Sequence, residues 1–424
     1  MTARTLQLTC LYIVFTFGIA NVAEGICQEK QKKPQLTDQE RKLVVAAAEQ
    51  YFKQGKVDNE SAVNQLMVKK SGGLRWNVNR VYKDHVAKTL KADFDAKRVT
   101  FEKHVSPYTV KTVGKKPKNG WPLVIAMHGG GGVPKATNDS QWKHMQVYYK
   151  DQKQLAGYKY LALRAPNDTW NGFYDDYVYP LIENLIKQQI VLGDVDSAKV
   201  FLIGYSHGGY GAFSIGPKIP HRFAAIHASA AAPTDGQTSA KTLRSTRFSF
   251  MVGGKDTNFG RAERCQKFAK LIKDLQRKNP REYPVEFIFH PDNGHTGLPD
   301  RNMISKLYPH SRLASPKHLT WEMTDSVVKR FFWLGVDNPS AGMEIDAEIV
   351  NNTIKISTIG CSEFSVFLDS RLIKPNNRVK LKIGDKITEV EYQPSFQMLC
   401  KTLMESGDIK LARECELAIK LESK

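Results

Sequence analysis

Short, nearly uninterrupted apolar runs recur through the middle of the chain. They occupy residues 122–127, 160–163, 200–203, 223–228, 248–252 and 285–289. Runs of this length are typical of parallel strands that are buried on both faces of a sheet. A further stretch, residues 99–113, alternates apolar and polar positions and also predicts a strand.

Stretches with helical spacing separate these runs. They cover residues 177–189, 209–216, 261–277 and 324–334. Strands that alternate with helices predict right-handed crossovers and a mostly parallel sheet with helices on both faces. In such a sheet, functional residues gather at the carboxyl ends of the strands.

The segment before the first strand has helical patterns. Thr37 and Glu40 form a capping-box pattern at the start of an amphipathic stretch. A second short helix is expected over residues 60–69, ending at a glycine pair, and a third from residue 76 to residue 90. These helices form an arm, which the sequence does not place relative to the functional edge of the sheet.

The pattern changes again near residue 337. Short strands are expected at residues 347–350, 353–356, 364–368, 379–383 and 387–390, followed by helices at residues 395–405 and 409–421. The expected organisation has four parts: residues 1–26 as a targeting segment, 27–98 as a helical arm, 99–336 as an α/β domain, and 337–424 as a small β-rich domain with closing helices.

The first 26 residues have the pattern of a signal peptide. Arg4 gives a positive start, residues 6–20 form an apolar core, and small residues near Gly25 suit a cleavage site. The core is short for a membrane span, and an uncleaved anchor is the alternative. Cys27 would suit a lipoprotein, but Ile26 before it fits that motif poorly. We therefore expect a secreted or periplasmic protein.

The 424-residue chain is strongly basic, with a formal charge of +19 at pH 7. Much of the excess lies in residues 28–120, which carry 21 basic and 10 acidic side chains. A basic secreted protein can adhere to acidic polymers, although a merely soluble basic surface is the simpler interpretation. No nucleic-acid-binding motif accompanies the charge, so no nucleic-acid partner is expected.

Cysteine usage argues against a metal site or a disulfide scaffold. Six cysteines are present, one of them inside the targeting segment, and no pair has C-x-x-C spacing. Cys400 and Cys415 could form a bridge in an oxidising compartment, which their spacing alone does not decide. No metal or other cofactor is expected.

The apolar run at residues 200–203 leads directly into the sequence Gly204-Tyr205-Ser206-His207-Gly208-Gly209. A helical stretch follows, so the pattern predicts a strand, a sharp turn and a helix. In such a turn the backbone at Ser206 is strained, and Gly204 and Gly208 must lack side chains. The helix N-terminus favours negative charge beside the lifted hydroxyl. Ser206 is therefore the candidate nucleophile; a glycine turn that only joins two elements is the alternative.

A second glycine-rich segment, residues 128–132, directly follows the strand that ends at Met127. Glycines let backbone amides approach a ligand closely, and acyl transfer needs amide donors where charge develops on the carbonyl oxygen. We expect an oxyanion hole built from the amide of His207 and from Gly130 and Gly131. A flexible turn is the alternative.

A base and its orienting acid are expected after two later strands. Asp256 follows the run at residues 248–252, and His295 follows the run at residues 285–289. The chain order Ser206, Asp256, His295 is that of α/β-hydrolases. In these roles Ser206 attacks, His295 takes and later returns its proton, and Asp256 holds the imidazole tautomer.

Two competing assignments stay open at this point. Asp235 follows the preceding strand and could replace Asp256, and His290 is the alternative base, although its place at a strand end favours packing. His207 is expected to line the site through its amide, whereas His221 and His227 are expected to be structural.

The chain from about residue 105 to residue 335 resembles the α/β-hydrolase fold family. The resemblance rests on residues 128–132, 196–209 and 220–225. The elbow region is similar to secreted polyhydroxybutyrate depolymerase-like and feruloyl-esterase-like hydrolases, and residues 206–212 are also similar to prolyl-oligopeptidase-type peptidases. The resemblance implies an α/β-hydrolase fold with a mostly parallel central sheet, here with an N-terminal helical arm and a small C-terminal β-rich domain.

Residues that contact the substrate are harder to identify. Trp170 follows a strand end and could form an aromatic wall for an acyl or sugar group, with core packing as the alternative. Tyr205, beside the nucleophile, is the second candidate. The leading hypothesis is a secreted serine hydrolase that cleaves carboxylic esters, small or attached to polysaccharide or polyester, through an acyl-enzyme. A peptidase with the same triad and a non-catalytic binding protein that kept the fold are the alternatives.

Overall fold

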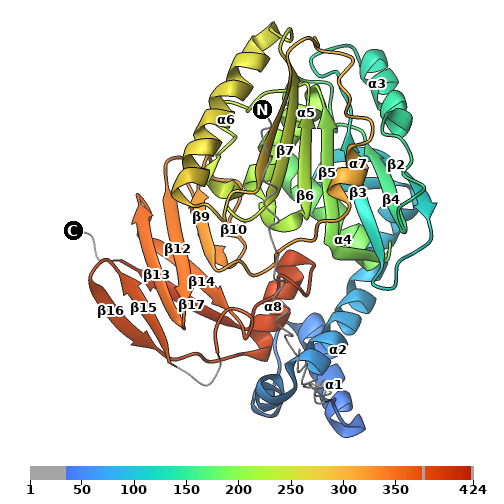
Figure 1. Ribbon diagram of the computed structural model, residues 1–424. Helices are drawn as coiled ribbons and strands as arrows, with labels where there is room; N and C mark the ends of the chain where they lie inside the picture. The colour runs from blue at the N-terminus through green and yellow to red at the C-terminus, as the bar shows by residue number, and fades with distance from the viewer. Residues whose placement is uncertain (1–34, 375–377, 422–424) are drawn as a thin grey trace, which may run out of the picture.

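An eight-stranded sheet forms the centre of the molecule (Figure 1). The computed structural model describes residues 35–374 and 378–421, so the expected targeting segment and Cys27 lie outside the described residues. The strands are β1 (Arg98–Phe101), β2 (His104–Gly114), β3 (Trp121–Met127), β4 (Gly157–Leu163), β5 (Val195–Tyr205), β6 (Ala225–Ser229), β7 (Arg247–Gly253) and β8 (Val285–His290).

The strand order is β1-β2-β4-β3-β5-β6-β7-β8. Strands β1 and β2 pair antiparallel, β2 pairs antiparallel with β4, and every other pair in this sheet is parallel. The sheet and the sharp turn after β5 together are the α/β-hydrolase arrangement, which confirms the predicted fold class.

Helices cover both faces of this sheet, as expected. Leu123, Ile125 and Met127 of β3 face one way, where α4 (Val178–Val191), α5 (His207–Lys218) and α6 (Arg261–Lys278) pack against them in one apolar core. Val124 and Ala126 face the other way, where α3 (Lys135–Tyr148) and α7 (Met303–Leu307) complete a second core. The alternation follows from the two-residue period of a strand.

The C-terminal part is built from two smaller sheets around one shared apolar core. One sheet has the order β16-β15-β13-β12-β9 and the other β10-β11-β14-β17. Their strands are β9 (His318–Glu322), β10 (Arg330–Phe331), β11 (Leu334–Gly335), β12 (Glu344–Val350), β13 (Thr353–Ile359), β14 (Glu363–Leu368), β15 (Val379–Ile383), β16 (Lys386–Val390) and β17 (Cys415–Lys420). Because β9 pairs with β12, the second unit includes residues before 337.

Two helices predicted from the sequence are wrong. Residues 324–334 are not helical: the stretch holds β10 and the start of β11, because the apolar residues around the fully buried Trp333 fill the core between the two sheets. Residues 415–420 form strand β17 beside β14, although Leu417 and Ala418 favour helix. In both stretches tertiary packing overrides local propensity.

The arm consists of two helices rather than three. Helix α1 (Asp38–Gln54) begins with the predicted capping box on Thr37, and α2 (Glu60–Asp95) continues through the glycine pair with a kink at Lys70. Their apolar faces form one buried cluster with α8 (Phe396–Ser406) of the C-terminal part. The predicted helix at residues 395–405 is thus confirmed, and it packs against the arm.

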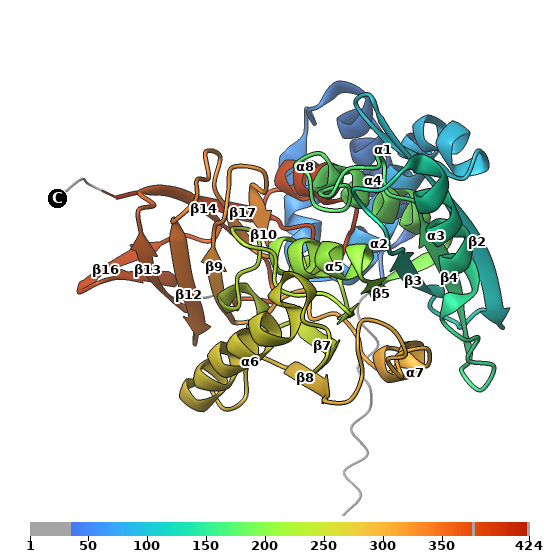
Figure 2. The same ribbon diagram turned by 90° about the horizontal axis from the view of Figure 1, so that it is seen from above.

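The arm lies at the end of the sheet where the parallel strands begin (Figures 1 and 2). Helix α8 packs against the arm, and Asp408, just after α8, accepts a hydrogen bond of 2.8 Å from Ser197 near the start of β5. Ser206 follows the other end of the same strand, so the arm is remote from the elbow. In the part of the chain that the structure describes, no helix is long and apolar enough to cross a membrane.

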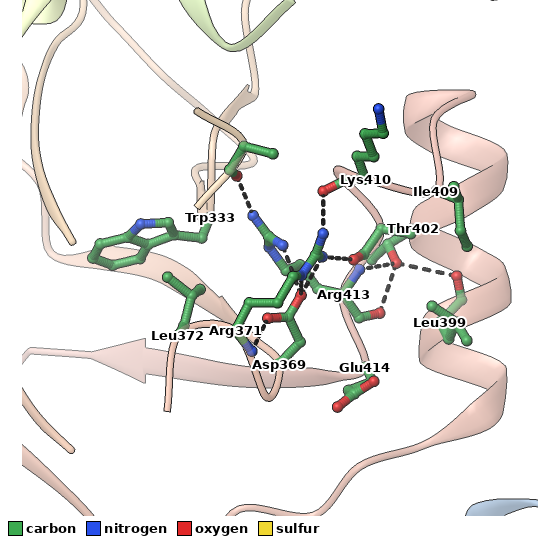
Figure 3. A network of polar contacts seen from close by, with 12 residues as sticks. Trp333, Asp369, Arg371, Leu372, Leu399, Thr402, Ile409, Lys410, Arg413 and Glu414 are labelled. Atoms are coloured by element: carbon green, nitrogen blue, oxygen red, sulfur yellow. Dashed lines mark hydrogen bonds and ion pairs between the residues drawn. The ribbon is translucent and has the colours of Figure 1, made fainter. Parts of the chain in front are cut away.

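A buried ionic network lies in the C-terminal part (Figure 3), and Arg75 connects the arm to the segment beside it. Asp369 accepts hydrogen bonds from Arg413 Nη1 at 2.7 Å and from Arg371 Nε at 2.8 Å. Arg75 of the arm donates to the carbonyl oxygens of Ile409 and Ala412 at 2.8 and 2.7 Å. Because Asp369 and Arg413 are both 1% exposed, losing Asp369 would leave the Arg413 charge buried without its carboxylate partner.

The bridge considered between Cys400 and Cys415 is absent. The thiols of Cys265, Cys361, Cys400 and Cys415 are all free and buried in the described residues.

Candidate active site

Ser206 occupies the turn between β5 and α5 with φ 54° and ψ −116°. This backbone conformation is strained for a residue with a side chain and is typical of a nucleophile elbow. The turn needs glycine on both sides: a Cβ on Gly204 would lie 1.9 Å from the carbonyl oxygen of Gly208, and a Cβ on Gly208 would lie 2.2 Å from that of Met127. The elbow predicted from the sequence is therefore present.

The three residues expected to form a triad lie in one hydrogen-bonded row. Ser206 Oγ is 3.0 Å from His295 Nε2, and His295 Nδ1 is 2.8 Å from Asp256 Oδ2. Asp256 follows β7 and His295 follows β8, and both strands run parallel to β5, so all three loops meet at one edge of the sheet. The Lys255 amide donates to the carbonyl oxygen of Asn293 at 2.9 Å, which joins the acid and base loops.

The environment keeps Asp256 ionised. Burial alone would raise the pKa of this carboxyl group, but hydrogen bonds and charge from His295 and Arg261 outweigh burial and lower it. Arg261 Nη1 lies 2.8 Å from Asp256 Oδ1, the oxygen that His295 leaves free. An ionised acid beside Nδ1 favours the imidazole tautomer that presents an acceptor nitrogen to Ser206.

The glycine segment lies beside the nucleophile, but not every amide in it is available. Gly131 N donates to Asn138 Oδ1 at 2.9 Å, so the expectation that Gly131 contributes to an oxyanion hole is corrected. Gly130 has φ 106°, a conformation that favours glycine. The His207 amide is the first of α5, where an amide has no partner inside the helix. These two remain as candidate oxyanion donors.

The imidazoles of His207 and His128 are buried and support this segment. Burial lowers the pKa of His207 to about 3 and that of His128 to about 4, so both rings are neutral near pH 7. His207 Nε2 lies 3.0 Å from the carbonyl oxygen of Trp170, and His128 Nε2 accepts the Ala165 amide at 3.1 Å. Neither ring bonds to Ser206, which agrees with the interpretation that His207 acts through its amide.

The structure does not bring the competing acid and base into this row. Asp235 has an exposed side chain that pairs with Arg264 at 2.8 Å. His290 ends strand β8 opposite Gly253, and it is His295 that bonds to Ser206.

The two candidate substrate-contacting residues have different surroundings. Trp170 is 41% exposed, and its ring lies 5.2 Å from that of Phe259, which is 64% exposed. The hydroxyl of Tyr205 donates to the carbonyl oxygen of His295, so this residue holds the base loop and its hydroxyl is not free for a ligand. Phe259 was not singled out from the sequence, because an aromatic residue in a loop carries no distinctive pattern.

Arg261 and Asn138 were also missed. Arg261 lies five residues after Asp256, and Asn138 lies on α3, seven residues after Gly131. A polar residue at such spacing predicts contact only once the loop conformation is known. Within the described ranges, no three His, Cys, Asp or Glu side chains gather as metal ligands would.

No model of a known protein family matches the chain, and no curated protein sequence is similar to it. Solved structures are similar to part of it. A thermostable esterase shares 19% identity over 51% of this chain and 64% of its own, with a TM-score of 0.39. The enterobactin esterase FES from Shigella flexneri shares 14% identity over 50% of this chain and 57% of its own, with a TM-score of 0.37. A putative dipeptidyl aminopeptidase IV from Bacteroides ovatus shares 12% identity over 50% of this chain and 36% of its own, with a TM-score of 0.36.

Proposed function

We propose that the protein is a serine hydrolase that cleaves carboxylic esters through an acyl-enzyme. The observation that carries this proposal is the row from Ser206 through His295 to Asp256, with contacts of 3.0 and 2.8 Å, at a strained turn that ends a buried strand. The three side chains come from separate loops. A row of this order positions an alcohol, a base and an acid as acyl transfer requires.

The chemistry follows from the positions of these atoms. His295 Nε2 accepts the hydroxyl proton while Ser206 Oγ forms a bond to the ester carbonyl carbon. The carbonyl oxygen then carries negative charge, which the amides of His207 and Gly130 stabilise. When the tetrahedral intermediate collapses, the bond to the alcohol oxygen breaks and His295 returns the proton to the leaving alcohol. Water, activated by the same nitrogen, then attacks the acyl-enzyme and releases the carboxylic acid.

The neutral His207 ring supports this assignment of the oxyanion donors. Its burial fixes the first residue of α5, and its Nε2 is held by the Trp170 carbonyl oxygen at 3.0 Å. The amide of the same residue is therefore presented in a fixed direction beside Ser206. A preorganised amide stabilises developing charge without reorganising during the reaction.

The proposal extends to location and partners. Secretion or export to the periplasm, expected from residues 1–26, would bring the enzyme to polysaccharide- or polyester-derived esters. The arm would add adhesion to acidic polymers, because Lys69, Arg80 and Lys88 of α2 are exposed. The arm lies away from the elbow, so a bound polymer there would leave the nucleophile open.

The test compares ester and peptide substrates on the protein and on Ser206→Ala. Nitrophenyl acetate and butyrate report esterase activity, and aminoacyl and prolyl nitroanilides report peptidase activity. We expect rapid ester turnover that Ser206→Ala abolishes while its circular dichroism spectrum stays unchanged. Faster cleavage of the nitroanilides would support the peptidase alternative, and ester turnover that survives in Ser206→Ala would rule out the proposed mechanism.

A further inference from the structure

A buried arginine contacts the acid of the row from behind. Arg261 is the first residue of α6 and is 5% exposed, and its Nη1 lies 2.8 Å from Asp256 Oδ1. Because His295 Nδ1 lies 2.8 Å from Oδ2, each carboxylate oxygen has its own cationic or N–H partner. A carboxylate held at both oxygens cannot rotate without breaking one of these bonds.

The same guanidinium also reaches the helix that carries the nucleophile. Arg261 Nε lies 3.1 Å from the hydroxyl oxygen of Tyr210. The amide of Tyr210 in turn donates to the carbonyl oxygen of Ser206 at 3.0 Å. Arg261 therefore connects the loop of the acid to the first turn after the nucleophile, two segments that are far apart in the sequence.

The position of this arginine is not explained by the helix that it begins. A cation at a helix N-terminus meets the positive end of the macrodipole and is unfavourable there. The pair with Asp256, which is 2% exposed, offsets this cost and supplies the buried carboxylate with a second partner. The guanidinium also lies 5.0 Å from the centre of the Phe259 ring, which closes the pair from one side.

We propose that Arg261 is a positioning residue of the catalytic row, so that the working unit has four members: Ser206, His295, Asp256 and Arg261. Arg261 fixes the rotation of the Asp256 carboxylate and keeps it ionised, and Asp256 in turn aims His295 Nε2 at Ser206. This inference rests on the proposed serine hydrolase function and assigns that site a residue beyond the expected triad. Arg261 itself does not touch the substrate.

The groups around Asp256 decide what the loss of Arg261 would do. His295 and Arg261 are the groups that bond to the carboxylate, and Tyr210 faces the guanidinium from α5. The Cys265 thiol on α6 also lies near, and burial raises its pKa to about 12, so it is neutral near pH 7. Without the guanidinium, Asp256 Oδ1 loses its charged partner, and among the side chains only His295 still holds the carboxylate.

The test measures kcat and KM against pH for Arg261→Met, Arg261→Lys and the matched control Arg264→Met. Arg264 lies one turn further along α6 and pairs with the exposed Asp235, so its loss removes a similar side chain away from the row. For Arg261→Met we expect kcat to fall about 10- to 100-fold with KM nearly unchanged, since part of the effect of general acid–base catalysis is lost. Because KM is nearly unchanged, kcat/KM should fall by about the same factor.

The conservative variant separates positioning from simple loss of packing. Arg261→Lys keeps the charge but not the fork that reaches both Asp256 and Tyr210, so we expect a three- to tenfold drop in kcat, estimated from about 1 kcal/mol for one hydrogen bond. Wild-type kcat in Arg261→Met would overturn the inference, as would an equal loss in Arg264→Met. If Arg261→Met does not fold, Arg261→Lys decides, and wild-type kcat in that variant would overturn it.

The same samples distinguish this inference from the function on which it rests. A wild-type protein that is folded but neither hydrolyses esters nor reacts with a fluorophosphonate contradicts the proposed function. A wild-type protein that reacts, together with an Arg261→Met variant of equal kcat and equal pH profile, contradicts the role of Arg261 alone.

Discussion

The side-chain oxygen of Asn138 accepts the amide of Gly131 at 2.9 Å and thereby holds the glycine segment beside the nucleophile. Asn138 Nδ2 donates to the carbonyl oxygen of Val133 at 3.0 Å and to Asp168 Oδ1 at 2.9 Å. One buried side chain on α3 thus holds the glycine segment at Gly131 and the residue that follows the segment, Val133, and ties both to the loop after β4. The direction in which the Gly130 amide points depends on this arrangement.

Replacing Asn138 should therefore weaken stabilisation of the oxyanion. For Asn138→Ala we expect kcat on nitrophenyl acetate to fall about tenfold, less than the loss known for deleting a donor outright, because the backbone amide itself stays. The control is Asn184→Ala. Asn184 lies on α4, and its side chain donates to the Thr100 carbonyl oxygen at 3.2 Å. Equal kcat in Asn138→Ala and wild type would show that the segment keeps its shape without this side chain.

The two candidate acids give a second prediction. Asp256→Asn should lower kcat/KM by up to about 10⁴-fold, because an amide no longer favours the required imidazole tautomer. Asp235→Asn should leave kcat/KM within about twofold, because its side chain is exposed and pairs only with Arg264 at the surface. Ester hydrolysis by the two purified variants measures the difference. The reverse result would move the acid to Asp235.

The exposed rings of Trp170 and Phe259 give a third prediction. Their centres lie 5.2 Å apart next to the glycine segment, and together they offer a flat apolar surface. For esters of a ring-bearing acid, Trp170→Ala and Phe259→Ala should each raise KM about three- to tenfold, as expected for losing one stacking partner. Acetate esters should be unaffected. Leu271→Ala is the control, because Leu271 is an exposed apolar residue on α6.

The same KM measurements can also contradict the prediction that these two rings contact the acyl group. If KM rises by the same factor for acetate and for ring-bearing esters, the two rings support the shape of the site and do not contact the acyl group.

The main sheet could be predicted from the sequence because its strands are long apolar runs. Each of these runs forms a strand. The elbow at Ser206 could be predicted because its turn excludes side chains at Gly204 and Gly208, where an added Cβ would lie 1.9 and 2.2 Å from backbone oxygens. Asp256 and His295 could be chosen because parallel strands bring their carboxyl ends to one edge. The chain order of nucleophile, acid and base (Ser206, Asp256, His295) is also the order found in α/β-hydrolases.

The parts that the sequence did not predict depend on contacts across the fold. Residues 324–334 have an apolar content that suits a helix, but Trp333 lies in the turn between β10 and β11 and fills the core between the two smaller sheets. Arg261 and Asn138 are ordinary polar residues until the loops around them are folded. The sequence also could not show that the Gly131 amide already has a hydrogen-bond partner, because that partner, Asn138, lies on a different element, α3.

The buried network around Asp369 gives a fourth prediction, on stability. Burial would raise the pKa of Asp369, but the guanidinium groups of Arg413 and Arg371 hold it well below its ordinary value. Asp369→Asn should lower the free energy of unfolding at pH 7 by about 3–5 kcal/mol, because Arg413 is then buried without a charged partner. Urea unfolding followed by circular dichroism measures the change.

The pH dependence of this difference has a defined sign. A carboxyl group whose pKa is lowered on folding stabilises the protein fully above its unfolded pKa of about 3.9, and this contribution is lost as the pH falls. The gap between wild type and Asp369→Asn should therefore be constant above about pH 5 and shrink below pH 4. Asp274→Asn, which removes an exposed partner of Arg277, should change stability by less than about 1 kcal/mol at any pH.

The most direct test of the account is covalent labelling with a fluorophosphonate. The purified protein and Ser206→Ala are treated with the reagent, and the adduct is located by intact mass and peptide mapping. We predict one adduct per chain, on Ser206, and none on Ser206→Ala. A folded protein that takes up no label, or that is labelled on another residue, would contradict the central claim that the row from Ser206 to Asp256 activates this hydroxyl.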